Sequence, residues 1–399
     1  MTGDRGLRGP LAFFVAVRAV SNTAYRMVYP FLPVFARSLG VDLGAMSLAL
    51  SVRSGAGALG PLLAPWSDRH GRRFGLSLGL GLFTAGAFLA LAGPGFTAFA
   101  AALVLMTVGK YVLDPAILAH LSDVVPYARR GRALALTELS WALAFVLGVP
   151  AAGFAVAKLG PRAPFAALAA LGLAGLVSVR AFLPRGKGTK AAGATAGHRR
   201  SFGAVFRSPA ALSGLAVILT VSMANELVSF VLGVWLEDSF GLRIAGLGVA
   251  AAAIGLAELG GEGLVAATVD RLGKTRALMI GLAANAAAAA LLPLSGRTTA
   301  AALAGLALFY MTFEFTVVSL IPVMSEILPQ ARATLLAFFA ASFSLGRAVG
   351  SLLSPRLYGL GFPAVALAAA GLNAVAFLFL LRLRRLRRAA ARGPEAVRD

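Results

Sequence analysis

The sequence predicts an all-α integral membrane protein with twelve transmembrane helices in two pseudo-symmetric six-helix halves. The first observation is composition, since 59% of the 399 residues are hydrophobic and only 13% are charged. Ordinary soluble proteins carry about 25% charged residues. The second is a series of apolar runs, each near the roughly 20 residues that a helix needs to cross a bilayer. The third is an internal repeat, which predicts the two halves.

Twelve apolar runs meet the length that a spanning helix requires. We expect spans at 11–36, 44–67, 74–93, 96–125, 133–157, 163–183, 208–236, 244–269, 276–294, 298–328, 333–357 and 362–382. The first run lacks a small-residue cleavage site before the next polar block, so we expect a retained helix rather than a signal peptide.

The distribution of basic residues predicts the orientation of these spans. One set of alternate loops, together with both ends, carries most of the Lys and Arg. The opposite loops hold only Arg37, Lys158, Arg162, Arg243, Arg297 and Arg356. Because basic loops stay in the cytoplasm, both termini are predicted to be cytoplasmic. Topology thus accounts for the formal charge of +21, and we expect no nucleic-acid partner.

The stretch from 183 to 209 contains glycine, alanine and basic residues without an apolar period. We therefore divide the chain into an N-terminal six-helix half (1–183), a cytoplasmic linker (184–207), a C-terminal six-helix half (208–383) and a basic cytoplasmic tail (384–399). The tail is expected to meet the anionic headgroups of the bilayer.

Two matches reveal an internal repeat. "LSDVVPYAR" (121–129) resembles "MSEILPQAR" (324–332) at an offset of 324 − 121 = 203, and Asp68 in "SDRHGRR" matches Asp270 in "VDRLGKTR" at 270 − 68 = 202. Parallel six-helix repeats with a site between them near mid-membrane are typical of secondary transporters.

"GPLLAPWSDRHGRR" (60–73) resembles the signature G-x-x-x-D-R-x-G-R-R/K of the major facilitator superfamily. "YPFLPVFARSLG" (29–40) and "LDPAILAHLSDVVPYARRGRALAL" (113–136) are also similar to that family, in particular to its twelve-helix drug–proton antiporters. Two features depart from the pattern. "AALVLMTVG" lacks the arginine often found early in helix 4, and "AFVLGVPAAG" (144–153) matches the helix 5 antiporter motif only in part. Both concern export direction and proton coupling rather than the fold.

The resemblance implies a cytoplasmic latch that stabilises the outward-open state. Its residues are Gly60, Asp68, Arg69, Gly71, Arg72 and Arg73, with Asp270 and Arg271 as a weaker second copy. An acid beside a basic cluster and a helix N-terminus can form charge-assisted bonds in one conformation and break them in the other. The alternative is a basic turn that only sets topology.

Ionisable residues inside the spans are functional-site candidates, because each charge costs about 2.5–3.5 kcal/mol to insert. The N-terminal half embeds a net positive set, Arg18, Arg26, Arg53, Lys110, Asp114 and Glu138. The C-terminal half embeds a net negative set, Glu226, Glu258, Glu262, Glu314 and Arg347. Lys110 and Asp114 are four residues apart on one helix and are expected to neutralise each other in part.

Four of these acids are candidates for proton coupling. Burial disfavours the charged form of a carboxyl, so a carboxyl in a poorly solvated cavity can exchange a proton near neutral pH. Glu226 and Glu314 lie near mid-span and come first, followed by Glu258 and Asp114. The alternative is permanent pairing with arginine, for example Glu314 with Arg347. We expect such pairing for Glu262 and Glu138.

Polar residues on the first, second, fourth and tenth spans are candidates for a substrate cavity: Asn22, Tyr25, Arg26, Tyr29, Arg53, Lys110 and Tyr310. Those on the first span are three or four residues apart and share one stripe. The apolar remainder suits an amphipathic or lipophilic small molecule.

These observations predict a secondary active transporter that exports amphipathic, drug-like small molecules by proton-coupled alternating access. The alternative is a facilitator or exporter of one specific anionic metabolite or lipid without proton antiport. We do not expect the protein to be an enzyme, since the chain has only three histidines and no cysteine from which to build a catalytic site. The sequence contains no ATP-binding P-loop motif, which argues against ATP-driven transport. We also expect no cofactor, no metal, a monomer, and the cytoplasmic (inner) membrane of a bacterium.

Overall fold

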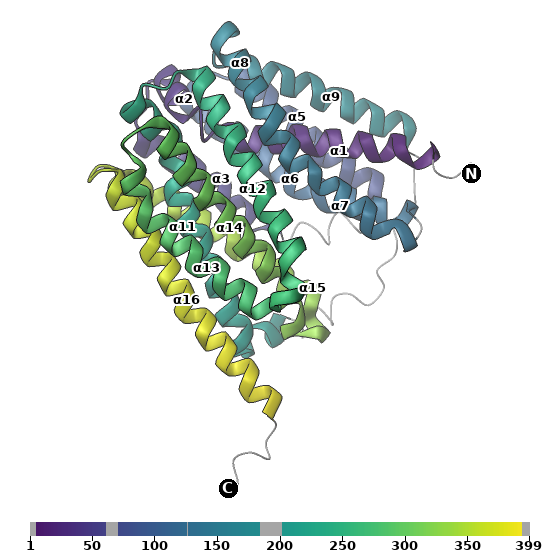
Figure 1. Cartoon of the computed structure of the whole chain (residues 1–399). Coiled ribbons are helices and arrows are strands. Elements are labelled where there is room, and N and C mark those ends of the chain that lie inside the picture. The colour runs from purple at the N-terminus through teal and green to yellow at the C-terminus, as the bar shows by residue number, and fades with distance from the viewer. Residues whose placement is uncertain (1–4, 61–70, 126, 184–201, 393–399) are drawn as a thin grey trace. The chain divides into compact units, whose positions relative to one another are not determined.

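The computed structural model describes residues 5–60, 71–125, 127–183 and 202–392, and the regular structure within these ranges is helical (Figure 1). In this part of the chain ten helices are long and apolar enough to cross a membrane, or up to eleven if one bent pair is a single span. The all-α membrane fold is thereby confirmed.

The chain forms two compact units. The first is Met1–Ala191 with Phe230–Leu256, and the second is Ala192–Ser229 with Ala257–Asp399. The first contains α1 (Arg5–Arg26), α2 (Leu32–Leu39), α3 (Leu43–Gly57), α5 (Arg72–Ala92), α6 (Gly95–Val124), α7 (Tyr127–Leu143), the π-helix η1 (Ala144–Gly148), α8 (Val149–Leu159) and α9 (Ala163–Phe182). The domain boundaries expected at 183 and 208 remain a prediction, because the two compact units are divided at other positions along the chain.

The remaining helices are α11 (Pro209–Phe240), α12 (Ile244–Leu272), α13 (Lys274–Leu291), the 3₁₀-helix η2 (Leu292–Ser295), α14 (Thr299–Ile327), the 3₁₀-helix η3 (Pro329–Ala331), α15 (Arg332–Tyr358) and α16 (Phe362–Arg392). Helices α11 and α12 are each divided between the units. In the second unit α13 packs on α14 and α16, and α15 packs on α14 and α16.

The first predicted span, 11–36, is wrong as a single helix. Helix α1 ends at Arg26, residues 27–31 form a turn, and α2 begins at Leu32. Pro30 and Pro33 explain the break, because proline lacks the amide hydrogen of the helical ladder and disfavours the helical conformation of the residue before it. At the far end of α2, Gly40 adopts a left-handed φ of 65°, and α3 leaves at 113° to α2.

The fifth predicted span, 133–157, contains a π-helical turn. Helices α7 and α8 are joined by η1, and Pro150 is the second residue of α8. Since Pro150 cannot donate to the carbonyl one turn before it, the local widening of the ladder has a clear cause. A Cβ at Gly148 would overlap the side chain of Thr23. This glycine therefore lets η1 lie directly against α1, the helix that carries the candidate residues Asn22, Tyr25 and Arg26.

The internal repeat is visible in equivalent turns and ion pairs. Gly71 precedes α5 with φ of 92°, and Gly273 precedes α13 with φ of 78°. The next residues pair with acids at matching positions, Arg72 with Asp123 at 2.9 Å and Lys274 with Glu326. The offsets are 274 − 72 = 202 and 326 − 123 = 203, which are the offsets of the sequence repeat.

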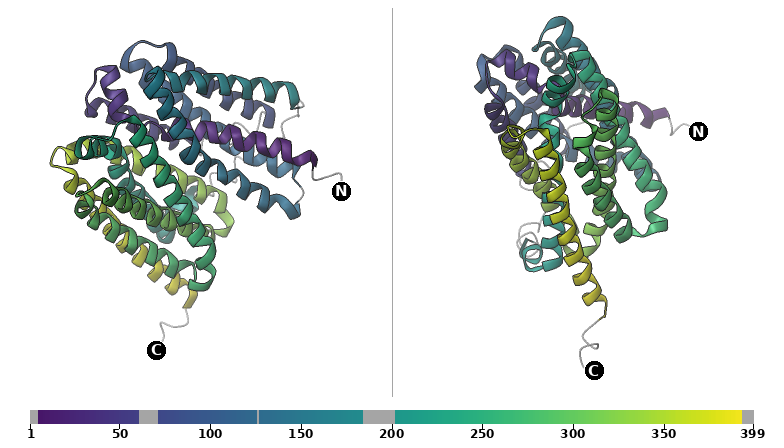
Figure 2. Two further views of the ribbon diagram at one scale, coloured as in Figure 1. Left: turned by 45° about the horizontal axis from the view of Figure 1, so that its top comes forward. Right: turned by 60° about the vertical axis from the view of Figure 1, so that its left-hand side comes forward.

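The last helix is longer than its predicted span of 362–382. Helix α16 continues to Arg392, and Figure 2 shows its final turns extending beyond the other helices of its unit. Arg387 pairs with Glu326 at 2.9 Å, and Arg384 donates to the sulfur of Met279 at 3.4 Å. The beginning of the predicted basic tail is therefore helical and held by α13 and α14.

Candidate functional site

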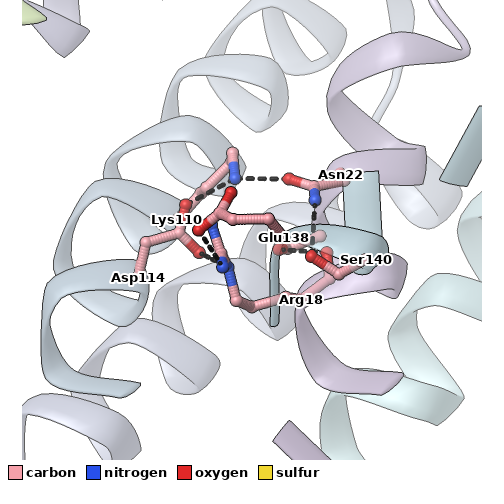
Figure 3. A network of polar contacts seen from close by, with 7 residues as sticks. Arg18, Asn22, Lys110, Asp114, Glu138 and Ser140 are labelled. Atoms are coloured by element: carbon pink, nitrogen blue, oxygen red, sulfur yellow. Dashed lines mark hydrogen bonds and ion pairs between the residues drawn. The ribbon is translucent and has the colours of Figure 1, made fainter. Parts of the chain in front are cut away.

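A polar network in the first unit joins three helices (Figure 3). We call it the N-terminal network. Its members are Arg18 and Asn22 from α1, Lys110 and Asp114 from α6, and Glu138 and Ser140 from α7. Residues four apart on a helix lie one above the other on the same face, so α1 and α6 each contribute two stacked side chains.

The network shares its charges among several partners. Arg18 Nη1 donates to Glu138 Oε1 at 2.9 Å, and Arg18 Nε lies 3.5 Å from Asp114 Oδ1. Lys110 Nζ donates to Asp114 Oδ2 and to Asn22 Oδ1, both at 2.5 Å. The predicted pairing of Lys110 with Asp114 is confirmed, and Glu138 is paired as expected. The cations are buried, whereas the Glu138 side chain is 57% exposed.

The guanidinium group of Arg26 packs against aromatic rings on α7 and η1. Its guanidinium carbon is 4.0 Å from the ring centre of Trp141 and 4.3 Å from that of Phe145. A guanidinium over aromatic rings at this distance is attracted by the negative face of the ring. The π-helical turn contains Phe145 and so supplies part of this contact.

Arg53 on α3 is deeply buried, with a relative exposure of 1%. Its Nη1 donates to the carbonyl of Tyr25 at 3.1 Å and its Nη2 to the hydroxyl of Tyr29 at 2.7 Å. The guanidinium carbon is also 4.2 Å from the Tyr25 ring centre. Three residues predicted for the cavity are thus brought into direct contact.

A narrow pocket adjoins Arg53, which we call the Arg53 pocket. It is lined by Ser21, Ala24, Tyr25, Arg53, Leu103, Met106, Thr107 and Lys110. These residues come from α1, α3 and α6. The pocket therefore connects the Arg53 contacts with the N-terminal network, because Lys110 belongs to both.

The second unit holds a buried ion pair, which we call the C-terminal pair. Glu226 on α11 lies 2.7 Å from Arg347 on α15, and their side chains are 0% and 3% exposed. Ser351 donates to the other Glu226 oxygen at 2.6 Å. A Cβ at Gly350 would lie 2.7 Å from the Glu226 Cβ and 2.8 Å from the Met223 carbonyl. Glycine at this position lets the two helices approach closely.

The sequence named Glu314 as an example partner of Arg347, and the structure pairs Arg347 with Glu226. The acid that pairs with Arg347 depends on which helices pack against each other. Residues near Arg347 in the sequence do not determine that packing. Of the other acids, Glu258 is 1% exposed on α12 and Glu314 is partly buried on α14. Tyr310 belongs to the second unit, where its hydroxyl lies 2.8 Å from that of Ser229.

The predicted latch is only partly within the described residues. Asp68 and Arg69 lie outside them, and Gly60 lies at the edge of a described range. Arg73 donates to the carbonyl of Arg180 at 2.6 Å. Asp270 and Arg271 are exposed near the end of α12.

Sequence reasoning missed three partners of its own candidates. Asp123 pairs with Arg72, Ser140 accepts from Asn22, and Ser351 donates to Glu226. A signal existed for Asp123, since it occupies the acidic position of the repeated motif and matches Glu326. The two serines carry no signal of this kind, because serine is common in membrane helices.

A bundle of spanning helices with repeated turns and embedded ion pairs defines the class of multi-pass membrane transporters. The family model of the Major Facilitator Superfamily matches residues 14–331, and the chain belongs to this superfamily.

Several relatives are transporters of the same family. The chain is 28% identical to the uncharacterized MFS-type transporter YwfA of Bacillus subtilis, over 88% of this chain and 86% of the relative. It is 26% identical to YceJ of the same organism, over 86% and 88%. A shorter match of 25%, over 38% of each chain, is to the B. subtilis Multidrug resistance protein 2.

Solved structures share the fold. A peptide transporter POT in complex with sulfate superposes with a TM-score of 0.75 at 16% identity, over 94% of each chain. A bacterial homologue of the lysosomal transporter Spinster, in an inward-facing conformation, gives a TM-score of 0.72 at 16% identity, over 98% of each chain.

Proposed function

We propose that this transporter exports amphipathic small molecules by proton-coupled alternating access, and that Glu226 is the coupling carboxyl. The observation that carries the proposal is the C-terminal pair, in which a fully buried carboxylate lies 2.7 Å from a buried arginine. Similarity to Multidrug resistance protein 2 over part of the chain supports drug-like substrates.

Protonation of Glu226 would remove the charge that Arg347 faces. An arginine cannot lose its own proton in a protein, so Arg347 would remain a buried cation that has lost the negative charge 2.7 Å away. That state is strongly unfavourable. Arg347 would therefore have to find another partner or move, and the contact between α11 and α15 would change with it. Proton binding would thus bias the helix packing of the second unit, which coupling to transport requires.

The test is proton flux in proteoliposomes. A pH gradient is imposed, a panel of lipophilic cations, zwitterions and anions is added, and the internal pH is followed. We expect a substrate-dependent proton leak that falls at least about tenfold in Glu226→Gln, a loss equivalent to about 1.4 kcal/mol, whereas downhill transport of the substrate continues. Glu237→Gln is the matched control, since Glu237 forms a partly exposed pair with Arg37 at 2.7 Å. An unchanged leak in Glu226→Gln would overturn the assignment of the coupling site.

Glu314, Glu258 and Asp114 are the next candidates for coupling. Glu258 is buried, and Asp114 is shared by two cations of the N-terminal network. If Glu226→Gln retains the leak, the same assay on Glu314→Gln, Glu258→Gln and Asp114→Asn identifies which of them carries the proton.

A second candidate function is facilitated transport without protons. It is favoured by the close contacts of Glu226, since Arg347 and Ser351 each contact one of its carboxylate oxygens. In that case the C-terminal pair only joins α11 to α15. Transport of a compound with no proton movement in the same vesicles would establish this reading.

We further propose that the transporter is a monomer in the cytoplasmic membrane of a bacterium, with both ends in the cytoplasm. Relatives from B. subtilis and the Inner membrane transport protein YdhP of Escherichia coli, 29% identical over 39% of this chain, support the location. The basic residues at the end of α16 suit contact with anionic lipids. The signature at 60–73 would then act as the latch between conformations.

A further inference from the structure

We infer that a cavity bounded by α1, α5, α6 and α9 of the first unit holds one acyl chain of an anionic phospholipid, whose phosphate lies at Arg73 and Arg180. We call it the α9 cavity, and its volume is about 180 Å³. The inference is independent of the proposed function. It concerns a lipid of the surrounding bilayer, and it depends neither on the transported molecule nor on proton coupling.

The α9 cavity has an apolar wall and room for part of a hydrocarbon chain. Leu80 and Phe83 of α5 and Leu113 of α6 line it, and each is at most 3% exposed. An apolar cavity of about 150 Å³ stays dry and takes up benzene. A cavity of about 180 Å³ therefore accommodates an acyl segment of comparable size.

The two hydroxyl groups that line the cavity are already used within their own helices. Ser21 donates to the carbonyl of Arg18 at 3.0 Å, and Ser178 donates to the carbonyl of Ala174 at 2.8 Å. Neither hydroxyl hydrogen is therefore available to a polar ligand. This lining favours hydrocarbon over water or a polar molecule.

The cavity opens at the outer surface of α1 and α9, which lie side by side (Figure 1). Ala16 of α1 and Leu171 and Ala174 of α9 line the cavity and are exposed. Helix α9 is apolar enough to cross a membrane, and its neighbouring residues Leu173 and Val177 are 45% and 59% exposed. An exposed apolar patch of this kind is typical of a membrane-contacting surface. A chain can thus enter the cavity directly from the bilayer.

Filling the cavity supplies contacts that the protein alone does not make. Two glycines of α9 line it. A Cβ at Gly172 would lie 2.5 Å from the Thr84 hydroxyl oxygen, and a Cβ at Gly175 would lie 3.3 Å from Leu80. Helices α5 and α9 are therefore in close contact beside the cavity. A chain gains no hydrophobic free energy on leaving the lipid, since lipid tails are as apolar as leucine. The gain comes from atoms that line a void and lack partners until it is filled.

Two arginines at adjoining helix ends suit the phosphate of the same lipid. Arg73 at the start of α5 donates from Nη2 to the carbonyl of Arg180 near the end of α9 at 2.6 Å. Arg180 is exposed, and it forms no ion pair within the ranges that the structure describes. A guanidinium matches phosphate oxygens in a planar fork, and basic side chains near the membrane surface attract anionic lipids.

The spacing between these arginines and the cavity fits one lipid molecule. Leu80 follows Arg73 on α5 by 80 − 73 = 7 residues, and Gly172 precedes Arg180 on α9 by 180 − 172 = 8 residues. At 1.5 Å per residue these separations are about 10–12 Å. One leaflet contributes about 15 Å of hydrocarbon, half of the bilayer core. A lipid with its phosphate at the arginines would therefore reach the cavity with the middle of its chain.

Photocrosslinking in nanodiscs tests the inference. The full-length protein is placed in phosphatidylcholine with a small fraction of phosphatidylglycerol that carries a diazirine near the middle of one acyl chain. After illumination, mass spectrometry locates the adducts. Bulk lipid reaches only exposed side chains, so adducts at Leu80, Phe83 and Leu113 require a chain inside the cavity. We expect adducts at these residues, and we expect excess unlabelled phosphatidylglycerol to reduce them.

Variants separate the chain site from the headgroup site. Ala174→Phe at the opening should remove most of the buried adducts, and Ala16→Phe tests the same opening from α1. Leu173→Phe is the control, because Leu173 is exposed beside the cavity without lining it. In Arg180→Gln the buried adducts should fall about fivefold, which corresponds to about 1 kcal/mol for one basic residue near an anionic surface. Arg162→Gln, at the other end of α9, should leave them unchanged.

Adducts confined to exposed residues, or buried adducts that unlabelled phosphatidylglycerol does not reduce, would overturn the inference. Equal labelling by a phosphatidylcholine probe, or no change in Arg180→Gln, would overturn the assignment of an anionic headgroup to the arginines. Displacement of the probe by a transported compound, but not by unlabelled phosphatidylglycerol, would assign the cavity to the substrate instead. Glu226→Gln should keep the adducts, so failure of proton coupling and failure of lipid binding are separate outcomes.

Discussion

The N-terminal network and the C-terminal pair place arginine against glutamate in different ways. Arg18 has two acidic partners, Glu138 and Asp114, and the Glu138 side chain is 57% exposed. Arg347 is paired with Glu226 in a site where both side chains are almost fully enclosed. A shared, partly exposed cluster can lose one partner and rearrange, whereas loss of one member of an enclosed pair leaves the other buried without the contact at 2.7 Å. The network distributes charge among side chains of three helices, whereas the pair joins two helices through one enclosed contact.

The strongest way to break this comparison is to remove one member of the C-terminal pair. Glu226→Leu would remove the carboxylate that lies 2.7 Å from the buried Arg347, and we expect the free energy of unfolding to fall by about 3–5 kcal/mol. Chemical or thermal unfolding in detergent measures it. The double variant Glu226→Leu with Arg347→Leu should recover most of the loss, since replacing both members of a buried pair is often neutral. A double variant as unstable as the single one would contradict this explanation.

A smaller effect is expected from the glycine that allows the C-terminal pair to form. In Gly350→Ala the new Cβ would lie 2.7 Å from the Glu226 Cβ, so α11 and α15 must separate. Overpacking of this kind costs about 1–3 kcal/mol. Gly371→Ala on α16 is the matched control, because nothing lies within 4 Å of its Cβ position, and it should stabilise the protein by about 0.5–1 kcal/mol. Equal melting temperatures for the two variants would show that the close approach is not needed.

The two regions also differ in how far they could be predicted from the sequence. The pairing of Lys110 with Asp114 was predictable, because both lie on one helix and helical geometry fixes their separation. The pairing of Glu226 with Arg347 was not, since it depends on which face α11 presents to α15 and on the small residues between them. Apolar runs located most spans. They did not show the break after Arg26, because Pro30 and Pro33 lie within an apolar run that reads as continuous.

The smallest effect should come from the exposed acid of the N-terminal network. Glu138→Gln removes one partner of Arg18 but leaves Asp114 at 3.5 Å, and exposed ion pairs contribute only about 0–1 kcal/mol. We expect the free energy of unfolding to fall by no more than that, with a smaller difference at high salt because exposed charges are screened. A loss as large as that of Glu226→Leu would mean that Glu138 is enclosed in the membrane. The contrast between a shared, partly exposed network and an enclosed pair would then fail, and with it the argument that the first unit tolerates a change of charge partner.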